Sequence, residues 1–329
     1  MKKHLAKKVI AFVAILLIGF LPSICAADTI VYTGAPGDWS DGALWRNLSV
    51  TPNTTGALPT TADTAIINGN RIADVNSVIG TVAGGIIVSN QFDPAMQGTL
   101  NVNSGGSLTY DGVLSIASAA GGAGTLNITG GNLTSINDGS RLVLGGSAGG
   151  TFNLSGGTFT AQGSAPTDGL TIRDITLNLS GGTFDLSGGQ VVPQNVTFNV
   201  IGDDTTILTD RLNHGGAAST ATYNFVFDSD GVSSFTNAAF MNLINATINV
   251  DGSAYTGGAG TFTLFDSANL VEGSTSQNIT GAFAGFDAVF STADNGNDVI
   301  LTLTTAVPEP SSLILLGGGM IGFCLRRRR

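Results

Sequence analysis

An internal repeat is the feature that most constrains the fold. Four segments superpose: GTLNVNSGGSLT from Gly98, GTLNITGGNLT from Gly124, GTFNLSGGTFT from Gly150 and ITLNLSGGTFD from Ile175. Their Gly-Gly pairs end at positions 106, 131, 157 and 182, in steps of 25, 26 and 25. Units of about 25 residues, with three short strands between Gly, Asp and Asn turns, are typical of one coil of a β-solenoid. The sequence therefore predicts an all-β fold: a single elongated solenoid, interpreted as a right-handed parallel β-helix.

Strict alternation within each repeat assigns side chains to the two sides of the coil wall, because successive residues of a strand point to opposite faces. The apolar positions should point inward, and the Gly-Gly pair should form a corner where a side chain would obstruct a tight bend. The predicted inward residues are Leu100, Val102, Leu126, Ile128, Phe152, Leu154, Leu177 and Leu179, followed after each corner by Leu108, Leu133, Phe159 and Phe184. The predicted outward series, a candidate glycan-facing ladder, is Asn101, Asn127, Asn153 and Asn178.

The segments on either side of the regular repeats, 98–189, should close the ends of the solenoid. Residues 28–97 lack the repeat and contain both tryptophans, Trp39 and Trp45. We interpret this segment as an N-terminal cap with the first coils. The tryptophan pair could alternatively stack on sugar rings. Residues 190–305 contain further strands, expected as irregular solenoid or sheet, and end in a hairpin at Asn295-Gly296 that serves as a C-terminal cap.

Charge is distributed unevenly along the chain. The stretch 28–308 carries 22 acidic residues against five arginines and has no lysine. Such a surface repels nucleic acid, whose recognition depends on Lys and Arg at the phosphates. Both cysteines, Cys25 and Cys324, lie in the terminal segments, so the middle of the chain has no thiolate nucleophile and no cysteine metal ligand.

The repeats present no clear catalytic or metal-binding motif. His214 is the only histidine after position 27, and we interpret it as a turn residue rather than as part of a Ser-His-Asp triad. Asp228 and Asp294 lie in short acidic runs that match turn chemistry better than a calcium loop. Only two basic residues, Arg141 and Arg173, lie within the clear repeats. We therefore expect no catalytic residue, no cofactor and no metal.

Both ends of the chain carry targeting signals. Four lysines, an apolar run and small residues before Asp28 form a predicted signal peptide, residues 1–27, with cleavage after Ala27. Residues 306–329 contain Pro308, Glu309 and Pro310, then a short apolar run from Leu313 to Leu325. That run would span roughly 20 Å as a helix, against about 30 Å of hydrocarbon. The terminal block of Arg326, Arg327, Arg328 and Arg329 should act as a membrane stop, because basic residues favour the cytoplasmic side.

This tail resembles the PEP-CTERM sorting signal of Gram-negative bacteria. The resemblance implies that an exosortase-type membrane transpeptidase recognises Pro308-Glu309-Pro310 and processes the tail. It also implies a transient anchor in the inner membrane, a final position in the cell envelope, on the outer surface or in the extracellular matrix, and an association with exopolysaccharide and biofilm. The repeats, with FTLFD before a closing VILTL strand, are similar to the passenger regions of autotransporter-type surface proteins, which supports the solenoid architecture.

Two classes of function are compatible with the sequence. One is an exported, noncatalytic envelope or matrix protein whose polar ladder associates with exopolysaccharide or mediates adhesion. The other is a carbohydrate-active β-helix enzyme, a polysaccharide lyase or glycoside hydrolase. An enzyme needs carboxylates or bases that converge on one face, whereas the ionisable residues of the repeats are scattered. We therefore predict the noncatalytic class.

Overall fold

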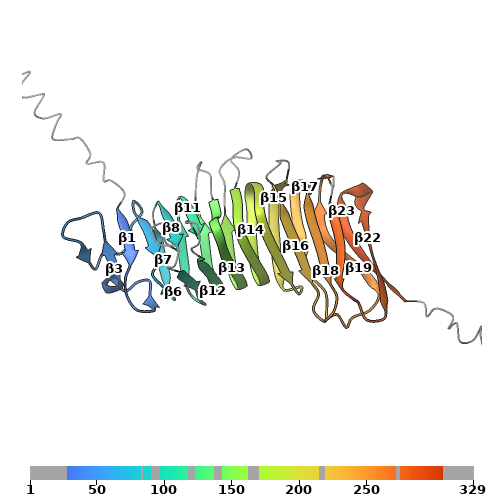
Figure 1. The fold of residues 1–329 in the computed structure, drawn as a ribbon, viewed down its shortest axis with the longest axis horizontal. Coiled ribbons are helices and arrows are strands. Elements are labelled where there is room, and N and C mark those ends of the chain that lie inside the picture. The colour runs from blue at the N-terminus through green and yellow to red at the C-terminus, as the bar shows by residue number, and fades with distance from the viewer. Residues whose placement is uncertain are drawn as a thin grey trace, which may run out of the picture.

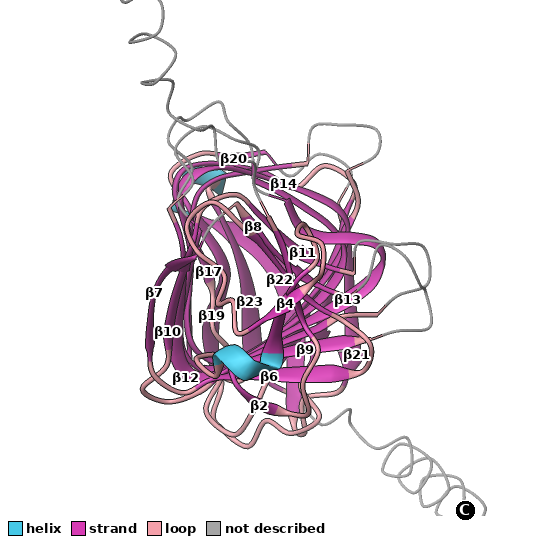
Figure 2. Cartoon of the chain, turned by 90° about the vertical axis from the view of Figure 1, so that its left-hand side faces the viewer, coloured by secondary structure: helices cyan, strands magenta, loops and turns pink. Residues whose placement is uncertain are grey.

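The computed structural model is a straight rod of stacked β-strands, shown from the side in Figure 1. It describes residues 28–82, 84–89, 97–117, 123–136, 143–161, 170–214, 219–271 and 275–306. The described part of the chain contains no α-helix. Parallel pairing between successive coils of roughly 26 residues makes the fold a β-solenoid, as the repeat predicts. Figure 2 looks along the rod from its N-terminal side and shows the strands enclosing a closed cross-section.

The N-terminal end combines the first coils with an antiparallel cap. The first strand of the rod pairs with a parallel neighbour on one side and with an antiparallel cap strand on the other. The elements here are β1 Thr29–Tyr32, β2 Gly37–Asp38, the short 3-10 helix η1 Gly42–Leu44, β3 Trp45–Asn47, β4 Thr54–Thr55, β5 Thr64–Ile67, β6 Arg71–Val75, β7 Val78–Val82 and β8 Gly85–Val88.

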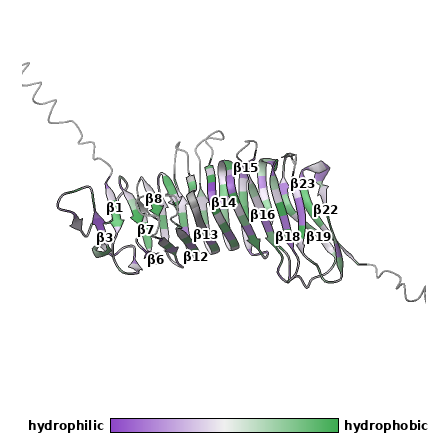
Figure 3. Cartoon of the chain, viewed as in Figure 1, coloured by the Kyte–Doolittle hydropathy of each residue, from purple (hydrophilic) through white to green (hydrophobic). Residues whose placement is uncertain are grey.

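The regular repeats form the middle of the rod, and the predicted register is confirmed. Leu126 lies beside Phe152 on the next coil, Phe152 lies beside Leu177, and every predicted inward residue is fully buried. Figure 3 shows hydrophobic and hydrophilic residues following one another along the strands, as this alternation requires. The strands are β9 Gly98–Val102, β10 Ser107–Tyr110, β11 Val113–Ile116, β12 Thr125–Ser135, β13 Val143–Ala161 and β14 Leu170–Ile201.

Glycine at the corners is required by backbone geometry. Gly157 has φ +74°, a conformation that L side chains rarely adopt, and a Cβ on it would overlap the carbonyl oxygen of Gly131 in the preceding coil. Gly182 has φ +85° and stands in the same relation to Gly157. The glycines therefore allow successive corners to stack directly on one another.

The core inside the rod is built from stacked apolar side chains. Phe159 and Phe184 stack with ring centroids 5.5 Å apart, and Phe152 packs against both rings edge-on. Further along, Phe198 and Tyr223 stack at 4.9 Å. Because strand pairing places equivalent residues of successive coils side by side, similar side chains lie above one another. The resulting column of buried apolar side chains stabilises the rod along its length.

Coils continue beyond residue 189 with the same parallel pairing. The predicted hairpin is confirmed: the last two strands pair antiparallel across eight residue pairs, and the final strand also pairs antiparallel with an earlier solenoid strand. The elements are β15 Thr205–Asn213, β16 Ala221–Val226, β17 Phe235–Asn242, β18 Ala246–Asp251, β19 Gly260–Ser267, β20 Leu270–Val271, β21 Ser276–Gly281, β22 Phe286–Ala293, the 3-10 turn η2 Asp294–Gly296 and β23 Asp298–Thr305.

Candidate functional site

The candidate site is a polar face built around a continuous series of asparagines, which we call the Asn ladder. In each coil one asparagine points outward, and its Nδ2 donates a hydrogen bond to Oδ1 of the asparagine in the preceding coil. The seven donor–acceptor distances lie between 2.7 and 2.9 Å. The members, in order, are Asn101, Asn127, Asn153, Asn178, Asn199, Asn224, Asn249 and Asn278.

All amides of the Asn ladder point the same way, and a carboxylate fixes that direction. At the N-terminal end Asn101 Nδ2 donates to Asp74 Oδ1 at 2.7 Å. An ionised carboxylate can only accept hydrogen bonds. Asn101 must therefore turn its nitrogen toward Asp74 and its oxygen toward Asn127, and each following amide adopts the same orientation. In a similar way, an acidic side chain at the N-terminus of an α-helix interacts favourably with the N–H groups that point out of that end.

A second, shorter series runs beside the first and ends in the same manner. Thr129 Oγ1 donates to Asn103 Oδ1, Asn103 Nδ2 donates to Asn76 Oδ1, and Asn76 Nδ2 donates to Asp38 Oδ2 at 2.9 Å. The side-chain hydrogen bond from Ser40 is the main cause that lowers the pKa of Asp38. Both polar series therefore end at the N-terminal side in the side chain of an aspartate.

A column of hydroxyls lies two residues before the Asn ladder on each strand, hence on the same outward face. Strand pairing places the first four of these residues in register from coil to coil, and the last four likewise. All are half-buried except the last, which is exposed. This Thr column consists of Thr99, Thr125, Thr151, Thr176, Thr197, Thr222, Thr247 and Ser276.

Together the Asn ladder and the Thr column form a long polar face without charge, which we call the Thr–Asn face. Each interior amide uses one of its two N–H groups and one lone pair of its oxygen within the ladder, so one donor and one acceptor per coil remain. Every Thr adds a hydroxyl that can donate and accept. Such a face offers hydrogen-bond donors and acceptors to neutral polar ligands.

The four asparagines predicted from the repeats all lie on this face, but four further members of the ladder were missed. Asn199, Asn224, Asn249 and Asn278 lie on strands of the stretch that the repeat comparison described only as irregular. A signal was present, because TFN, TYN, TIN and SQN repeat the Thr/Ser-x-Asn pattern of TLN and TFN in the regular repeats. The glycan-facing role of the ladder stays a prediction.

The two tryptophans lie inside the N-terminal end of the core. Trp39 and Trp45 are buried, their rings meet edge-to-face at 4.6 Å, and Trp45 Nε1 donates to the Trp39 carbonyl oxygen at 2.8 Å. Tyr32 packs edge-on against Trp45. This packing matches the interpretation as a cap and leaves neither indole face open to a sugar ring.

His214 is also part of the interior. It is fully buried, and its Nε2 lies 2.7 Å from the hydroxyl oxygen of Tyr223, which stacks in the core. Burial lowers the pKa of His214 to about 4. The neutral imidazole has no route to a substrate on the outer surface.

Other candidate residues take part in local turn contacts. Asp228 accepts hydrogen bonds from the backbone N–H groups of Asp230 and Gly231, both at 2.9 Å; the Gly231 bond is the main cause that lowers its pKa. Asp294, which belongs to the other acidic run considered for calcium, lies in the hairpin turn η2. In the part of the chain that the structure describes, no group of three or more His, Cys, Asp or Glu residues is arranged to hold a metal ion.

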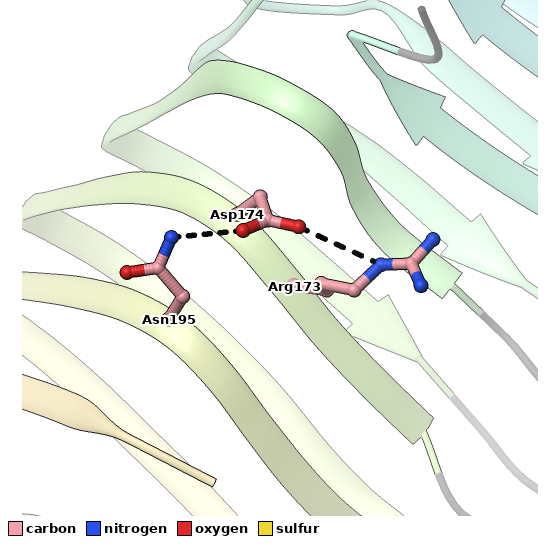
Figure 4. Close-up of polar contacts among 3 residues, drawn as sticks. All are labelled: Arg173, Asp174 and Asn195. Carbon is pink, nitrogen blue, oxygen red and sulfur yellow. Dashed lines mark hydrogen bonds and ion pairs between the residues drawn. The ribbon is translucent and has the colours of Figure 1, made fainter. Parts of the chain in front are cut away.

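Arg173 is held at the surface of a corner. Its Nε lies 3.7 Å from Asp174 Oδ2, while Asp174 Oδ1 accepts from Asn195 Nδ2 at 2.8 Å (Figure 4). The Arg173 side chain is 47% exposed, so the ion pair is solvated and weak. The other predicted basic residue, Arg141, lies outside the described residues.

The predicted targeting residues also fall outside the described residues. These are the signal peptide with Ala27, the motif Pro308, Glu309 and Pro310, and the terminal block of Arg326, Arg327, Arg328 and Arg329. Within the described ranges, the structure contains no helix with the length and hydrophobicity that crossing a bilayer requires.

Comparison with known families identifies the tail. Residues 306–329 match the family model of the PEP-CTERM protein-sorting motif. No curated protein and no solved structure matches the chain significantly. The match defines a class: an extracellular protein that is exported, passes through a transient membrane-anchored stage and is sorted by exosortase, the enzyme that recognises such motifs. Within that class, this chain joins the PEP-CTERM motif to a β-solenoid.

Proposed function

We propose that the protein is a noncatalytic component of the cell envelope or extracellular matrix that binds exopolysaccharide through its Thr–Asn face. On this proposal a signal peptide, residues 1–27, directs export, and the mature rod resides at the outer surface of a Gram-negative cell or in its biofilm matrix. The observation that carries the proposal is the uncharged, regularly spaced Thr–Asn face on a strongly acidic chain.

The chemistry of this face suits a polymer of neutral sugars. Sugar hydroxyls both donate and accept hydrogen bonds. The remaining amide N–H groups of the ladder can donate to them, its carbonyl groups can accept from them, and the hydroxyls of Thr125, Thr151 and Thr176 can do both. Neighbouring strands lie about 4.8 Å apart. A linear polysaccharide that runs along the rod axis would therefore meet equivalent groups coil after coil. Many weak contacts of this kind combine into firm retention without a deep pocket.

A noncatalytic role is supported by the placement of the ionisable groups. His214 lies in the core, Arg173 is paired with Asp174, and the Asp228 carboxylate accepts hydrogen bonds from backbone N–H groups of its own turn. General acid–base hydrolysis of a glycosidic bond needs two carboxyl groups about 5–10 Å apart that face one substrate. A carbohydrate-active enzyme is the second candidate, and release of reducing ends from the host polysaccharide would favour it.

Matched hydroxyl removal tests the binding face. In the test variant, Thr125, Thr151 and Thr176 on the Thr–Asn face become valine, which keeps shape and strand propensity. The control variant carries the same change at another half-buried column of three successive coils, made of Thr109, Thr134 and Thr160.

Binding to exopolysaccharide from the producing organism is measured by co-sedimentation. Losing three hydrogen bonds of roughly 1 kcal/mol each should weaken binding by at least tenfold in the test variant, with little change in the control. Equal binding by both variants and the unmodified chain would refute the proposed face.

A further inference from the structure

The C-terminal end of the rod presents a strand edge without a partner in the described structure. β22 pairs with β23 along one side, and no other described strand pairs with it. Figure 1 shows β22 at the extreme end of the rod. The row of backbone N–H and C=O groups along its other side is a template for another strand.

β22 lacks the features that natural proteins use to protect such an edge. Its eight residues pair with β23 without a register shift, so no bulge twists the edge away. Its sequence, FDAVFSTA, has no proline, no lysine and no arginine, and Asp287 is its only charge. Proline, lysine and bulges are the usual protections against pairing between chains. This edge is therefore competent for pairing.

Both faces of β22 offer apolar surface. On the outer face Val289 is 58% exposed. On the inner face Phe286, Ala288 and Phe290 pack against the end of the core but remain partly exposed. The core therefore ends in incompletely covered apolar side chains, which an added strand would cover.

We infer that two copies of the chain pair through β22, antiparallel about a two-fold axis beside Val289. In this register Val289 lies opposite Val289 on the outer face. On the inner face the small Ala288 lies opposite the large Phe290, twice by symmetry. Asp287 lies opposite Ser291, so no like charges face each other directly. Such an interface is self-complementary, as a two-fold dimer requires.

The last residues that the structure describes lie at one end of β22, away from the proposed two-fold axis. The chain reaches Thr305 at the Phe286 end of β22, away from Val289, and Ala306 is fixed there by its N–H bond to the Gly285 carbonyl oxygen. Because β22 extends the sheet formed by β17, β19 and β23, pairing would join two such sheets into one. The product would be a rod of about twice the length with an N-terminal cap at each end.

Cysteine cross-linking in the full-length chain tests the dimer. Cys25 and Cys324 are first replaced by serine, and Val289→Cys is then introduced. Opposed cysteines in an antiparallel pair lie close enough for a disulfide. The matched control is Val78→Cys, since Val78 is even more exposed, at 78%, but lies far from this end of the rod. Mild oxidation should convert most of the Val289→Cys chain to a disulfide dimer and little of the Val78→Cys chain.

A charge variant separates edge pairing from other association. Val289→Lys places an ammonium group on an exposed side chain, where the fold tolerates it, and should convert the dimer to monomer in mass photometry. Circular dichroism verifies that the rod stays folded. The inference would be overturned by equal cross-linking of the two cysteine variants or by a monomeric unmodified chain. It would also be overturned by a dimer that persists with Val289→Lys, a result that would assign association to the C-terminal segment.

Discussion

Replacement of Asn153 by aspartate tests whether the Asn ladder stabilises the rod by its direction. Asn153 Nδ2 donates to Asn127 Oδ1, and Asn153 Oδ1 accepts from Asn178, both at 2.7 Å. Aspartate has the same shape and can still accept from Asn178, but its carboxylate cannot donate to Asn127. Two acceptor oxygens then face each other where a hydrogen bond existed.

The expected cost follows from the half-buried position of this contact. The lost hydrogen bond contributes roughly 1 kcal/mol, and the unsatisfied, partly desolvated acceptors add about as much, giving about 2 kcal/mol at pH 7. When the pH falls through the titration range of the carboxyl group, the protonated form regains a donor. The destabilisation should therefore shrink at low pH, opposite to the usual effect of acid on a carboxylate in a favourable contact.

Thermal or urea unfolding followed by far-UV circular dichroism measures this effect. The control is Thr151→Asp, which adds the same charge on the same strand and face at a residue outside the ladder. At pH 7 the Asn153→Asp variant should unfold several degrees below the control, and the gap should narrow at pH 3. Equal stability of the two variants at pH 7, or a gap that widens in acid, would refute the directional role of the ladder.

Two further predictions concern the core and the tail. The pKa of His214 is about 4 in the folded chain against about 6.5 when unfolded. The contribution of the neutral imidazole to the free energy of unfolding is therefore complete above pH 6.5 and is lost as the pH falls toward 4. The loss amounts to about 2 kcal/mol between pH 7.5 and 5. The unfolding free energy of the unmodified chain, measured against pH, should fall over this range, whereas that of the His214→Gln variant should change less. Parallel pH profiles of the two chains would argue against a buried neutral imidazole. In the native host the tail should be removed at or near Pro308-Glu309-Pro310, so intact-mass analysis of the surface-associated protein should find Arg326 to Arg329 missing, and their retention on most molecules would contradict processing.

Local alternation was enough to predict much of the architecture. In a repeat such as TLNIT, Leu126 and Ile128 can only share one side of a strand while Asn127 takes the other, and the Gly-Gly pair marks the corner at Gly131. Because each coil has nearly the same length, these assignments also fix which residues of neighbouring coils lie side by side. The buried column and the outward asparagines follow directly.

Features that depend on variable spacing or distant residues could not be predicted in the same way. The step from Asn178 to Asn199 is 21 residues, against 25 for the step from Asn153 to Asn178, and this shorter coil hid the continuation of the ladder. The direction of the amides depends on Asp74, which lies in the first coils outside the repeats. The free edge at β22 depends on the pairing of β23 with β19, two strands that β20, β21 and β22 separate in the chain.

The Asn ladder also bears on how such a chain can change length during evolution. Every interior rung presents the same donor to the coil before it and the same acceptor to the coil after it, whichever coil it belongs to. A duplication or deletion of one whole repeat, such as the segment from Gly124 to Gly149, would join identical partners and preserve the orientation set at Asp74. Genetic gain or loss of repeats can therefore adjust the length of the rod while both ends of the solenoid and the sorting signal stay unchanged.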